Sequence, residues 1–504
     1  MDVTKTRRVS ALAPAAGDLL VRIEGPDTEV SGVAFDSRRV GPGDLFFCVP
    51  GATSDGHLFA PAAAAAGAAA LVVERPTEAG PTEIVVTDAR RAMARIAAAF
   101  HGNPAGDLLI LGVTGTNGKT TTAFLLESIL RASGRSPGLI GTIETRIAGR
   151  VRPGVRTTPE SVDLHGLFGE MRAAGVDAVA MEVTSHALTL HRVEGVHFAA
   201  AGFTNLTQDH LDFHASMEDY FAAKRSLFLP GRTARAAINV DDPYGRRLYD
   251  EADLPKVSFG VAPDAGVRAE NVRLGPNGSD MTIVVDADGL EPAKAEVRTS
   301  LIGGFNVSNC LGATAVALAA GISLDDALRG IQELRAVPGR FEAVDAGQPF
   351  SVVVDYAHTP DSLDNVLKAA RSLAAVRDGR VLVAFGAGGD RDRGKRPLMG
   401  GAAARLADVV VVTSDNPRSE EPRAIIDQIL EGVVAVRPDG ADAVIPDRRE
   451  AIAHLIRSAA AGDVVVIAGK GHETGQEFAD RTIPFDDREV AHEALVEAGW
   501  GERA

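Results

Sequence analysis

The stretch that most constrains the fold of this chain runs from Leu108 to Thr122. An apolar segment of strand length leads into the loop Gly115-Thr116-Asn117-Gly118-Lys119-Thr120-Thr121, and a helical pattern of apolar residues follows. In such a strand, loop and helix start, backbone N–H groups attract anionic oxygens, Lys119 adds a positive charge and the Thr120 hydroxyl can ligate Mg²⁺. The loop is shorter than the usual P-loop, because Val113 stands where that pattern has a glycine. The alternative is a tight strand-to-helix turn that binds nothing.

Composition restricts the class of protein. A chain of 504 residues is too long for one core, and about three domains are expected. The net charge of −16 argues against a general nucleic-acid or anionic-membrane surface. Only Cys48 and Cys310 are present, so no disulfide framework is expected and a reducing compartment suits the chain. The longest apolar run, from Leu58 to Val73, is broken by Pro61 and Gly67 and is too short to span a membrane. We therefore expect a cytoplasmic protein without a membrane span.

Turn-forming residues divide the chain at two points. His101-Gly102-Asn103-Pro104 ends a helical pattern, and Pro338-Gly339 looks like a second linker. The predicted domains are residues 1–104, 105–337 and 338–504. All three are expected to be α/β: a small N-terminal domain with an Ala-rich helix over 60–70, a central, mostly parallel sheet of the P-loop type with helices on both faces, and a Rossmann-like C-terminal domain. Weak alternation over residues 261–300 predicts added antiparallel strands in the central domain.

Polar residues follow the C-terminal ends of many expected strands, the edge where parallel sheets bind ligands. In the central domain Glu182 and His210 lie at such positions, and in the last third four strand ends are each followed by a polar cluster. Phosphoryl transfer needs a metal ion beside the phosphates, and Thr120 with Glu182 is the natural pair of oxygen ligands for Mg²⁺. His210 is a candidate further ligand, with a purely structural histidine as the alternative. Ser37 and Arg38 could bind a phosphate or a base, or could simply form a turn.

Several motifs, in order along nearly the whole chain, resemble those of the Mur ligases, the ATP-dependent amide ligases of peptidoglycan precursor synthesis. The loop of residues 115–121 is similar to the family's ATP loop. The other motifs are Asp36-Ser37-Arg38, Thr157-Thr158-Pro159, the segments 182–186, 205–210 and 221–228, Asp355-Tyr356-Ala357-His358, and Asp415-Asn416-Pro417-Arg418. The resemblance implies a three-domain enzyme whose N-terminal domain binds the uridine nucleotide.

The resemblance also implies roles for individual residues. Lys119, Glu182, His210 and Lys224 correspond to the catalytic positions, and Thr120, Glu182, His210 and Lys224, the last as a carbamate, to the Mg²⁺ ligands. The implied ATP contacts are Gly115, Thr116, Asn117, Gly118, Lys119, Thr120, Thr121, Asn306, Arg340 and Asp355. Those to the UDP-muramoyl substrate are Ser37, Thr157, Thr158, Thr184 and Arg192, and Leu190 departs from the Gln of some relatives.

The last domain is expected to hold the amino-acid substrate. The implied contacts are Arg391, Asp415, Asn416, Pro417, Arg418, Gly469 and Glu473. Arg418 can pair with a carboxylate in a bidentate fork, which the distal end of lysine lacks, so the sequence favours meso-diaminopimelate over L-lysine. The expected reaction joins diaminopimelate to the D-glutamate γ-carboxylate of UDP-MurNAc-L-Ala-D-Glu through an acyl phosphate, in a monomer that closes its C-terminal domain over the central one. A family member that adds lysine or glutamate remains an alternative, as does a nucleotide-gated switch with a P-loop, or a binding protein without activity.

Overall fold

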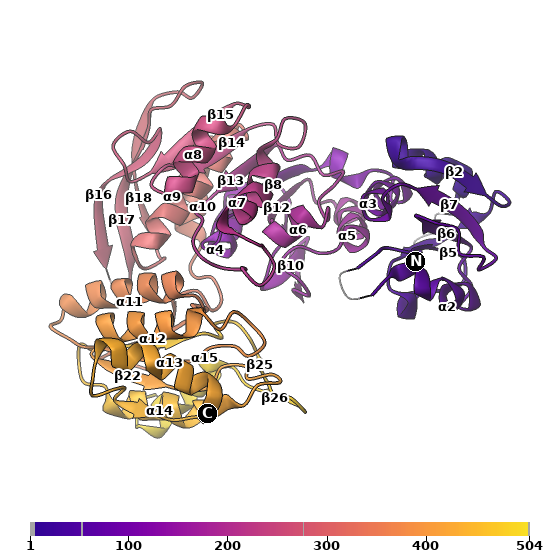
Figure 1. The fold of residues 1–504 in the computed structure, drawn as a ribbon. Helices are drawn as coiled ribbons and strands as arrows, with labels where there is room; N and C mark the ends of the chain where they lie inside the picture. The colour runs from indigo at the N-terminus through magenta and orange to yellow at the C-terminus, as the bar shows by residue number, and fades with distance from the viewer. Residues whose placement is uncertain (1–5, 52–53, 276, 502–504) are drawn as a thin grey trace.

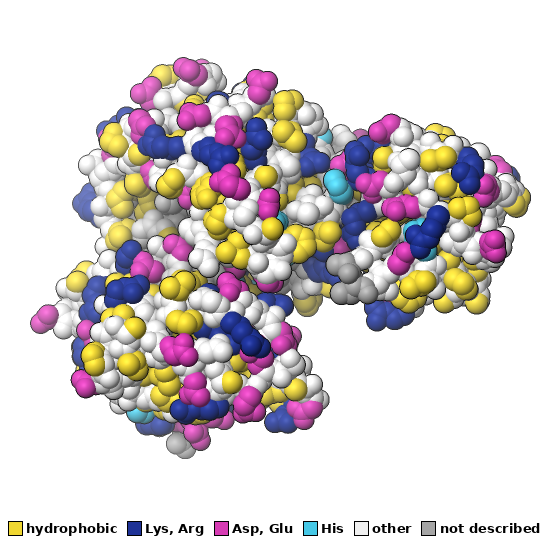
Figure 2. Space-filling view, viewed as in Figure 1, with side chains coloured by type: hydrophobic (Ala, Val, Ile, Leu, Met, Phe, Trp, Pro, Cys, Tyr) yellow, Lys and Arg dark blue, Asp and Glu magenta, His cyan; other side chains and the backbone are white. Residues whose placement is uncertain are grey.

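The computed structural model describes residues 6–51, 54–275 and 277–501. Figure 1 shows three bodies in chain order, with the central one between the N-terminal and C-terminal bodies. Each is built on its own sheet, so the predicted α/β fold class is confirmed. On the face shown in Figure 2, positive and negative side chains are interspersed over all three bodies. None of the helices in the described part of the chain is both long and apolar enough to cross a membrane.

The N-terminal sheet has the order β2-β7-β6-β5-β4. Its strands are β2 (Leu20–Glu24), β4 (Gly32–Ala34), β5 (Asp44–Phe47), β6 (Ala70–Val73) and β7 (Thr82–Val86), with the pair β1 (Arg7–Arg8) and β3 (Glu29–Val30) beside it. The helices are α1 (Val9–Leu12), α2 (Ala60–Ala65) and α3 (Ala89–Phe100). The helix predicted over residues 60–70 is too long, because the chain turns at Gly67, where φ is 96°, and Ala70 already belongs to a strand.

The central sheet has the order β11-β10-β9-β12-β8-β13-β14-β15-β16-β17-β18. Strands β9 (Pro137–Ile140), β12 (Ala178–Glu182), β8 (Leu109–Thr114), β13 (Ala200–Phe203), β14 (Ala236–Asn239) and β15 (Lys256–Gly260) pair in parallel. β17 (Gly278–Val285) pairs in antiparallel fashion with both β16 (Val267–Gly275) and β18 (Ala293–Thr299), which confirms the predicted antiparallel strands. The hairpin of β10 (Glu144–Ile147) and β11 (Arg150–Pro153) at the other edge was not predicted.

Helices cover both faces of the central sheet. One face packs against α4 (Lys119–Ala132), α9 (Gly304–Ala319) and α10 (Leu324–Glu333), whose buried side chains include Phe124, Leu311 and Ile331. The other packs against α5 (Ser161–Ala173), α7 (Met217–Arg225) and α8 (Pro243–Glu251). The short α6 (Ser185–Thr189) begins directly after β12. This arrangement brings the C-terminal ends of β8, β12 and β13 together at one edge of the sheet.

The C-terminal sheet has the order β19-β20-β24-β21-β22-β23. Its strands are β19 (Glu342–Ala343), β20 (Ser351–Asp355), β21 (Val381–Phe385), β22 (Val409–Val412), β23 (Ala443–Val444) and β24 (Val464–Ala468). Helices α11 (Pro360–Ala375), α12 (Lys395–Leu406) and α13 (Pro422–Val436) cover one face, and α14 (Arg448–Ser458) and α15 (Asp487–Glu497) the other. A small hairpin, β25 (Gly475–Glu477) and β26 (Thr482–Pro484), follows β24. The parallel pairing of β20, β24, β21 and β22 sets the polar clusters at their ends along one edge.

Candidate active site

The loop between β8 and α4 is held in place by close packing that only glycine permits. Gly115 has φ 151° and Gly118 has φ 85°. A Cβ atom at Gly115 would lie 1.9 Å from Thr204 Oγ1, and one at Gly118 would lie 2.5 Å from Asn309 Oδ1. Thr204 Oγ1 in turn donates to the carbonyl oxygen of Asn117 at 2.6 Å. This packing fixes the loop backbone directly before the start of α4, where backbone N–H groups can bind an anion.

Two lysine amines meet at this loop. Lys119 Nζ donates to the carbonyl oxygens of Gly115, at 2.9 Å, and Thr116, at 2.8 Å. Lys224 Nζ, from α7, donates to the same Gly115 oxygen at 2.7 Å, and its residue is only 1% exposed. Burial lowers the pKa of Lys119, and burial together with the charge of Lys119 lowers the pKa of Lys224 well below its usual value. Two charged amines on one carbonyl are unfavourable, so this pair favours a neutral or modified Lys224.

The predicted metal ligands are partly brought together. Thr120 Oγ1 lies 3.0 Å from Glu182 Oε2, and Glu182 also accepts the Thr142 backbone N–H at 2.7 Å and the Thr142 hydroxyl at 3.0 Å. Among the residues that the structure describes, no three His, Cys, Asp or Glu side chains cluster as a metal site. The oxygens of Thr120 and Glu182 nevertheless suit Mg²⁺, which takes oxygen ligands and keeps several waters.

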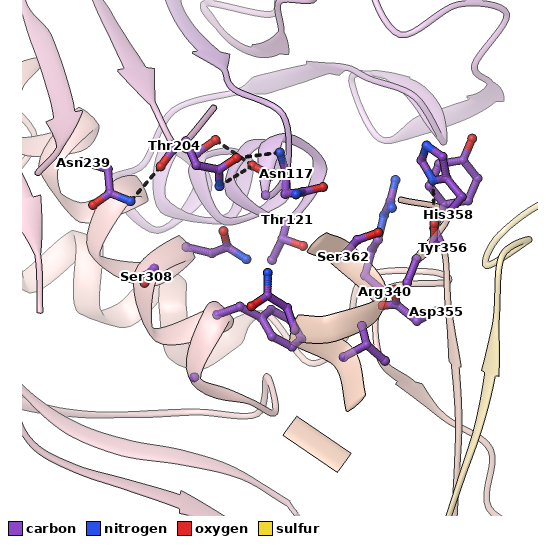
Figure 3. A pocket seen from close by; sticks show the side chains of 18 of the residues that line it. Asn117, Thr121, Thr204, Asn239, Ser308, Arg340, Asp355, Tyr356, His358 and Ser362 are labelled. Atoms are coloured by element: carbon purple, nitrogen blue, oxygen red, sulfur yellow. Dashed lines mark hydrogen bonds between the residues drawn. The ribbon is translucent and has the colours of Figure 1, made fainter. Parts of the chain in front are cut away.

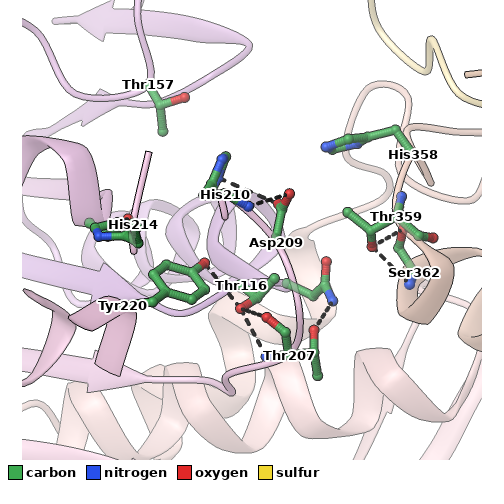
Figure 4. Close-up of polar contacts among 12 residues, drawn as sticks. Thr116, Thr157, Thr207, Asp209, His210, His214, Tyr220, His358, Thr359 and Ser362 are labelled. Atoms are coloured by element: carbon green, nitrogen blue, oxygen red, sulfur yellow. Dashed lines mark hydrogen bonds and ion pairs between the residues drawn. The ribbon is translucent and has the colours of Figure 1, made fainter. Parts of the chain in front are cut away.

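His210 lies in the loop after β13, as Figure 4 shows. Its Nε2 is 3.4 Å from Asp209 Oδ2, and its ring is 6.0 Å from that of Tyr220, which lies below the Lys224 amine. Partial burial lowers the pKa of His210 to about 4, so its imidazole is neutral near pH 7 and can ligate a metal. Lys224 would add an oxygen ligand only as a carbamate.

A cavity of about 380 Å³, here called the nucleotide pocket, lies between the central and C-terminal sheets (Figure 3). Of the predicted ATP contacts, Asn117, Gly118, Thr121, Arg340 and Asp355 line it. The described contacts across the domain boundary include Asn117 Nδ2 to Asp361 Oδ2 at 2.7 Å and Arg340 Nη2 to Thr120 Oγ1 at 3.2 Å. The C-terminal domain therefore closes one wall of the pocket.

Two of the predicted ATP contacts are less open than the resemblance implies. Asn306 does not line the pocket: it is 2% exposed, donates to the Ile302 carbonyl and accepts from Asn309. The Asp355 carboxylate lines the pocket but already accepts the Phe341 N–H at 2.6 Å. Burial raises the pKa of Asp355 to about 6.

A second cavity, of about 360 Å³ and here called the amino-acid pocket, lies at the ends of β20, β21, β22 and β24. Predicted diaminopimelate contacts that line it are Arg391, Asp415, Asn416, Arg418, Gly469 and Glu473; Pro417 is the one that does not. Its lining also contains groups to which the sequence analysis assigned no role: His186, Asp212, His358, Asp392 and Lys395. Lys395 stands at the first position of α12, shortly after the predicted contact Arg391 in the sequence, and that position could have signalled it.

Arg418 and Glu473 both line the amino-acid pocket, and both already make bonds within the C-terminal domain. Arg418, with φ 52°, donates Nε to Glu477 at 2.8 Å and Nη1 to the Gly389 carbonyl at 2.9 Å. Glu473 Oε2 accepts from Asn416 at 2.8 Å and from Lys470 at 3.2 Å. Burial and the charge of Asp415 raise the pKa of Glu473. The bonds to Glu477 and Gly389 hold the guanidinium in place. They use Nε and Nη1, which leaves Nη2 to donate to a substrate carboxylate.

A third cavity, a cleft of about 780 Å³, lies between the N-terminal and central sheets. Asp36 and Arg39 line it from one side and Arg156 and Glu160 from the other. Arg38 is instead turned back onto Asp36, with Nη2 and Oδ2 2.7 Å apart and 87% of its side chain exposed. Ser37 neighbours Asp36 but is not part of the lining.

The other predicted UDP-muramoyl contacts form one network between this cleft and Glu182. Thr157 Oγ1 lies 3.0 Å from Thr142 Oγ1, and Thr158 Oγ1 donates to the Glu182 carbonyl at 2.9 Å. Thr184 N donates to Thr158 Oγ1 at 3.1 Å, and Arg192 donates to the Thr158 carbonyl at 3.2 Å. Thr142, which bonds both Thr157 and Glu182, was missed because only the sheet brings it there.

The chain matches three family models: "Mur ligase family, catalytic domain" over residues 29–101, "Mur ligase middle domain" over 113–317, and "Mur ligase, glutamate ligase domain" over 339–471. It is 49% identical over 478 residues to a UDP-N-acetylmuramoyl-L-alanyl-D-glutamate--2,6-diaminopimelate ligase of Solibacter usitatus, covering 94% of this chain and 95% of that one. It is 47% identical to the enzyme of the same name from Streptomyces avermitilis, covering 96% of each. A solved structure of a ligase of that name superposes with a TM-score of 0.66 at 30% identity, covering 96% of this chain and 98% of the other.

Proposed function

The chain belongs to the Mur ligase family, and from this premise we propose that it is the ATP-dependent ligase that adds meso-diaminopimelate to UDP-N-acetylmuramoyl-L-alanyl-D-glutamate. The observation that carries the proposal is the amino-acid pocket, in which Arg391, Arg418 and Glu473 converge beside the nucleotide pocket. Two cations and a carboxylate suit a substrate that carries both carboxylates and ammonium groups.

The proposed reaction has three steps. The D-glutamate γ-carboxylate attacks the γ-phosphorus of ATP, giving an acyl phosphate and ADP. An amine of diaminopimelate attacks the acyl carbon, and phosphate leaves as the amide forms. Lys119 and the N–H groups of its loop neutralise charge on the transferring phosphoryl group. Thr120 and Glu182 would hold Mg²⁺, with His210 and a carbamylated Lys224 at a second ion; when bound, these ions would supply further positive charge there.

Specificity for diaminopimelate is assigned to Arg418. A substrate without the matching carboxylate would leave without a partner those guanidinium donors of Arg418 that are not bonded to Glu477 and Gly389. Glu473 is suited to an ammonium group of the same substrate. We propose that the uridine nucleotide occupies the cleft between the first two domains. The rest of that substrate would extend toward Glu182 along Thr157, Thr158, Thr184 and Arg192, which do not line the cleft, and Ser37 is proposed as a further contact. We further propose the domain boundaries 1–104, 105–337 and 338–504, and a monomer that acts in the cytoplasm.

The test is phosphate release from ATP by the purified protein with UDP-MurNAc-L-Ala-D-Glu and Mg²⁺. Release is expected to depend on meso-diaminopimelate and to be at least about 100-fold slower with L-lysine at equal concentration. Equal rates with both amino acids would contradict the assignment of Arg418. Phosphate release that needs no amino acid would instead support a nucleotide-gated switch.

A further inference from the structure

The nucleotide pocket and the amino-acid pocket meet at one point of the chain. Among the described residues, Tyr356 and His358, which follow β20, are the two that line both cavities. In the proposed reaction the acyl phosphate forms beside one pocket and the amine arrives from the other. A side chain at the junction is therefore placed beside the atoms that must join.

The ring of His358 has a defined orientation. Its Nδ1 lies 2.7 Å from the Tyr356 carbonyl oxygen. A carbonyl oxygen can only accept, so Nδ1 carries the hydrogen and the neutral ring has its lone pair on Nε2. No hydrogen bond joins Nε2 to any residue that the structure describes. In Figure 4 the ring is directed toward the loop that carries Asp209 and His210.

Charged groups from several elements face this imidazole. The charges of Lys395 on α12, Asp209 in the loop after β13 and Arg340 in the linker before β19 all act on it. The ring of His472 lies 5.1 Å from that of Tyr356. Burial and the cations Lys395 and Arg340 lower the pKa of His358 to about 4, whereas Asp209 raises it. The imidazole is therefore neutral near pH 7, and phosphate anions bound in the nucleotide pocket would make it more basic.

We propose that His358 Nε2 is the general base that takes the proton from the attacking amine; this rests on the proposed function. As the new N–C bond forms, the proton passes from the amine nitrogen to Nε2. The C–O bond to phosphorus-bound oxygen then breaks, and its electron pair leaves with the phosphate. The imidazolium returns its proton to water. Two other candidate bases that line the amino-acid pocket are already paired, His210 with Asp209 and Glu473 with Lys470.

The test replaces His358 with Asn, whose amide can still donate to the Tyr356 carbonyl but offers no base. Phosphate release with diaminopimelate is expected to fall about 10²- to 10³-fold at saturating substrates, with little change in the KM for ATP. Hydroxylamine is a far weaker base than an alkylamine and is neutral at pH 7, so it attacks the acyl phosphate without help. Its rate is expected to stay within about 3-fold of the unmodified protein, which a merely structural role for His358 would not produce. The remaining activity with diaminopimelate is expected to rise with pH.

The matched control is His492→Asn, which changes an exposed histidine on α15. His358→Gln serves as a second variant. Both His358 variants must unfold at the same temperature as the unmodified protein. Equal losses with hydroxylamine and diaminopimelate, or a loss that saturating ATP removes, would overturn the role of His358 as a base. An unmodified protein that shows no diaminopimelate-dependent release would count against the proposed function instead.

Discussion

At the scale of single residues, the most informative side chain is Lys224. It is almost fully buried, donates to the carbonyl of Gly115 and lies 4.6 Å above the Tyr220 ring. Burial and the charge of Lys119 lower its pKa well below the usual value, which increases the share of neutral amine. Carbon dioxide adds only to a neutral amine, so this environment permits the carbamate that the family resemblance implies.

Activity is therefore expected to depend on dissolved carbon dioxide. Removing bicarbonate should lower phosphate release by the unmodified protein about 10-fold or more, and adding it back should restore the rate, since the carbamate supplies charge for the second metal ion. Lys224→Arg, which cannot form the carbamate, should be inactive under both conditions. Full activity without bicarbonate, together with an unmodified Lys224 mass, would contradict the carbamate.

At the scale of secondary-structure elements, a buried ion pair supports the amino-acid pocket. Arg448, at the start of α14, is 1% exposed and bonds both Asp487 oxygens, at 2.7 and 2.6 Å. It also donates to the carbonyls of Ser414 and Ala468, directly before Asp415 and Gly469. The pair therefore ties the ends of β22 and β24 to α14 and α15.

Replacing Arg448 with Met should lower the free energy of unfolding of the C-terminal domain by about 3–5 kcal/mol, because Asp487 is left charged, buried and unpaired. The control is the neighbouring Arg449→Met, which removes an exposed pair with Glu493 and should cost no more than about 1 kcal/mol. Denaturant unfolding measures both. Similar losses for the two variants would contradict a stabilising role of the buried pair.

The elements also show what sequence could and could not predict. Continuous apolar runs such as 381–385 and 464–468 are typical of buried parallel strands, so the sheets and the polar clusters at their ends were predictable. The β10–β11 hairpin was not, because Arg150–Pro153 is exposed at an edge and lacks that pattern. Thr142 and the position of His358 at a junction of cavities depend on which strands become neighbours, and only the folded chain gives that.

At the scale of the whole molecule, the linker before β19 sets the C-terminal domain against the ATP loop. Gly339 has φ 65°, and a Cβ atom there would lie 2.1 Å from the backbone nitrogen of His472. Its neighbour Arg340 reaches Thr120 in the central domain. The linker at Gly339 and Arg340, which would have to adjust when the two domains close during turnover, is therefore tightly packed.

Gly339→Ala should lower kcat about 10-fold or more, because the added methyl displaces the linker from the turn at His472. Gly347→Ala is the matched control: its φ is also positive, 84°, but a Cβ atom there meets nothing within 4 Å. Both variants carry a similar backbone penalty of about 1 kcal/mol, so a difference between them reports the collision. Unchanged turnover in Gly339→Ala would count against closure through this linker.

In the proposed reaction, this chain forms an amide through an acyl phosphate on the D-glutamate of the uridine nucleotide. Labelling that γ-carboxylate with a heavy oxygen isotope, and analysing both products by mass spectrometry after reaction with ATP and meso-diaminopimelate, tests this directly. The expected products are the UDP-muramoyl tripeptide and phosphate that carries one labelled oxygen. Unlabelled phosphate, or phosphate release without the tripeptide, would contradict it.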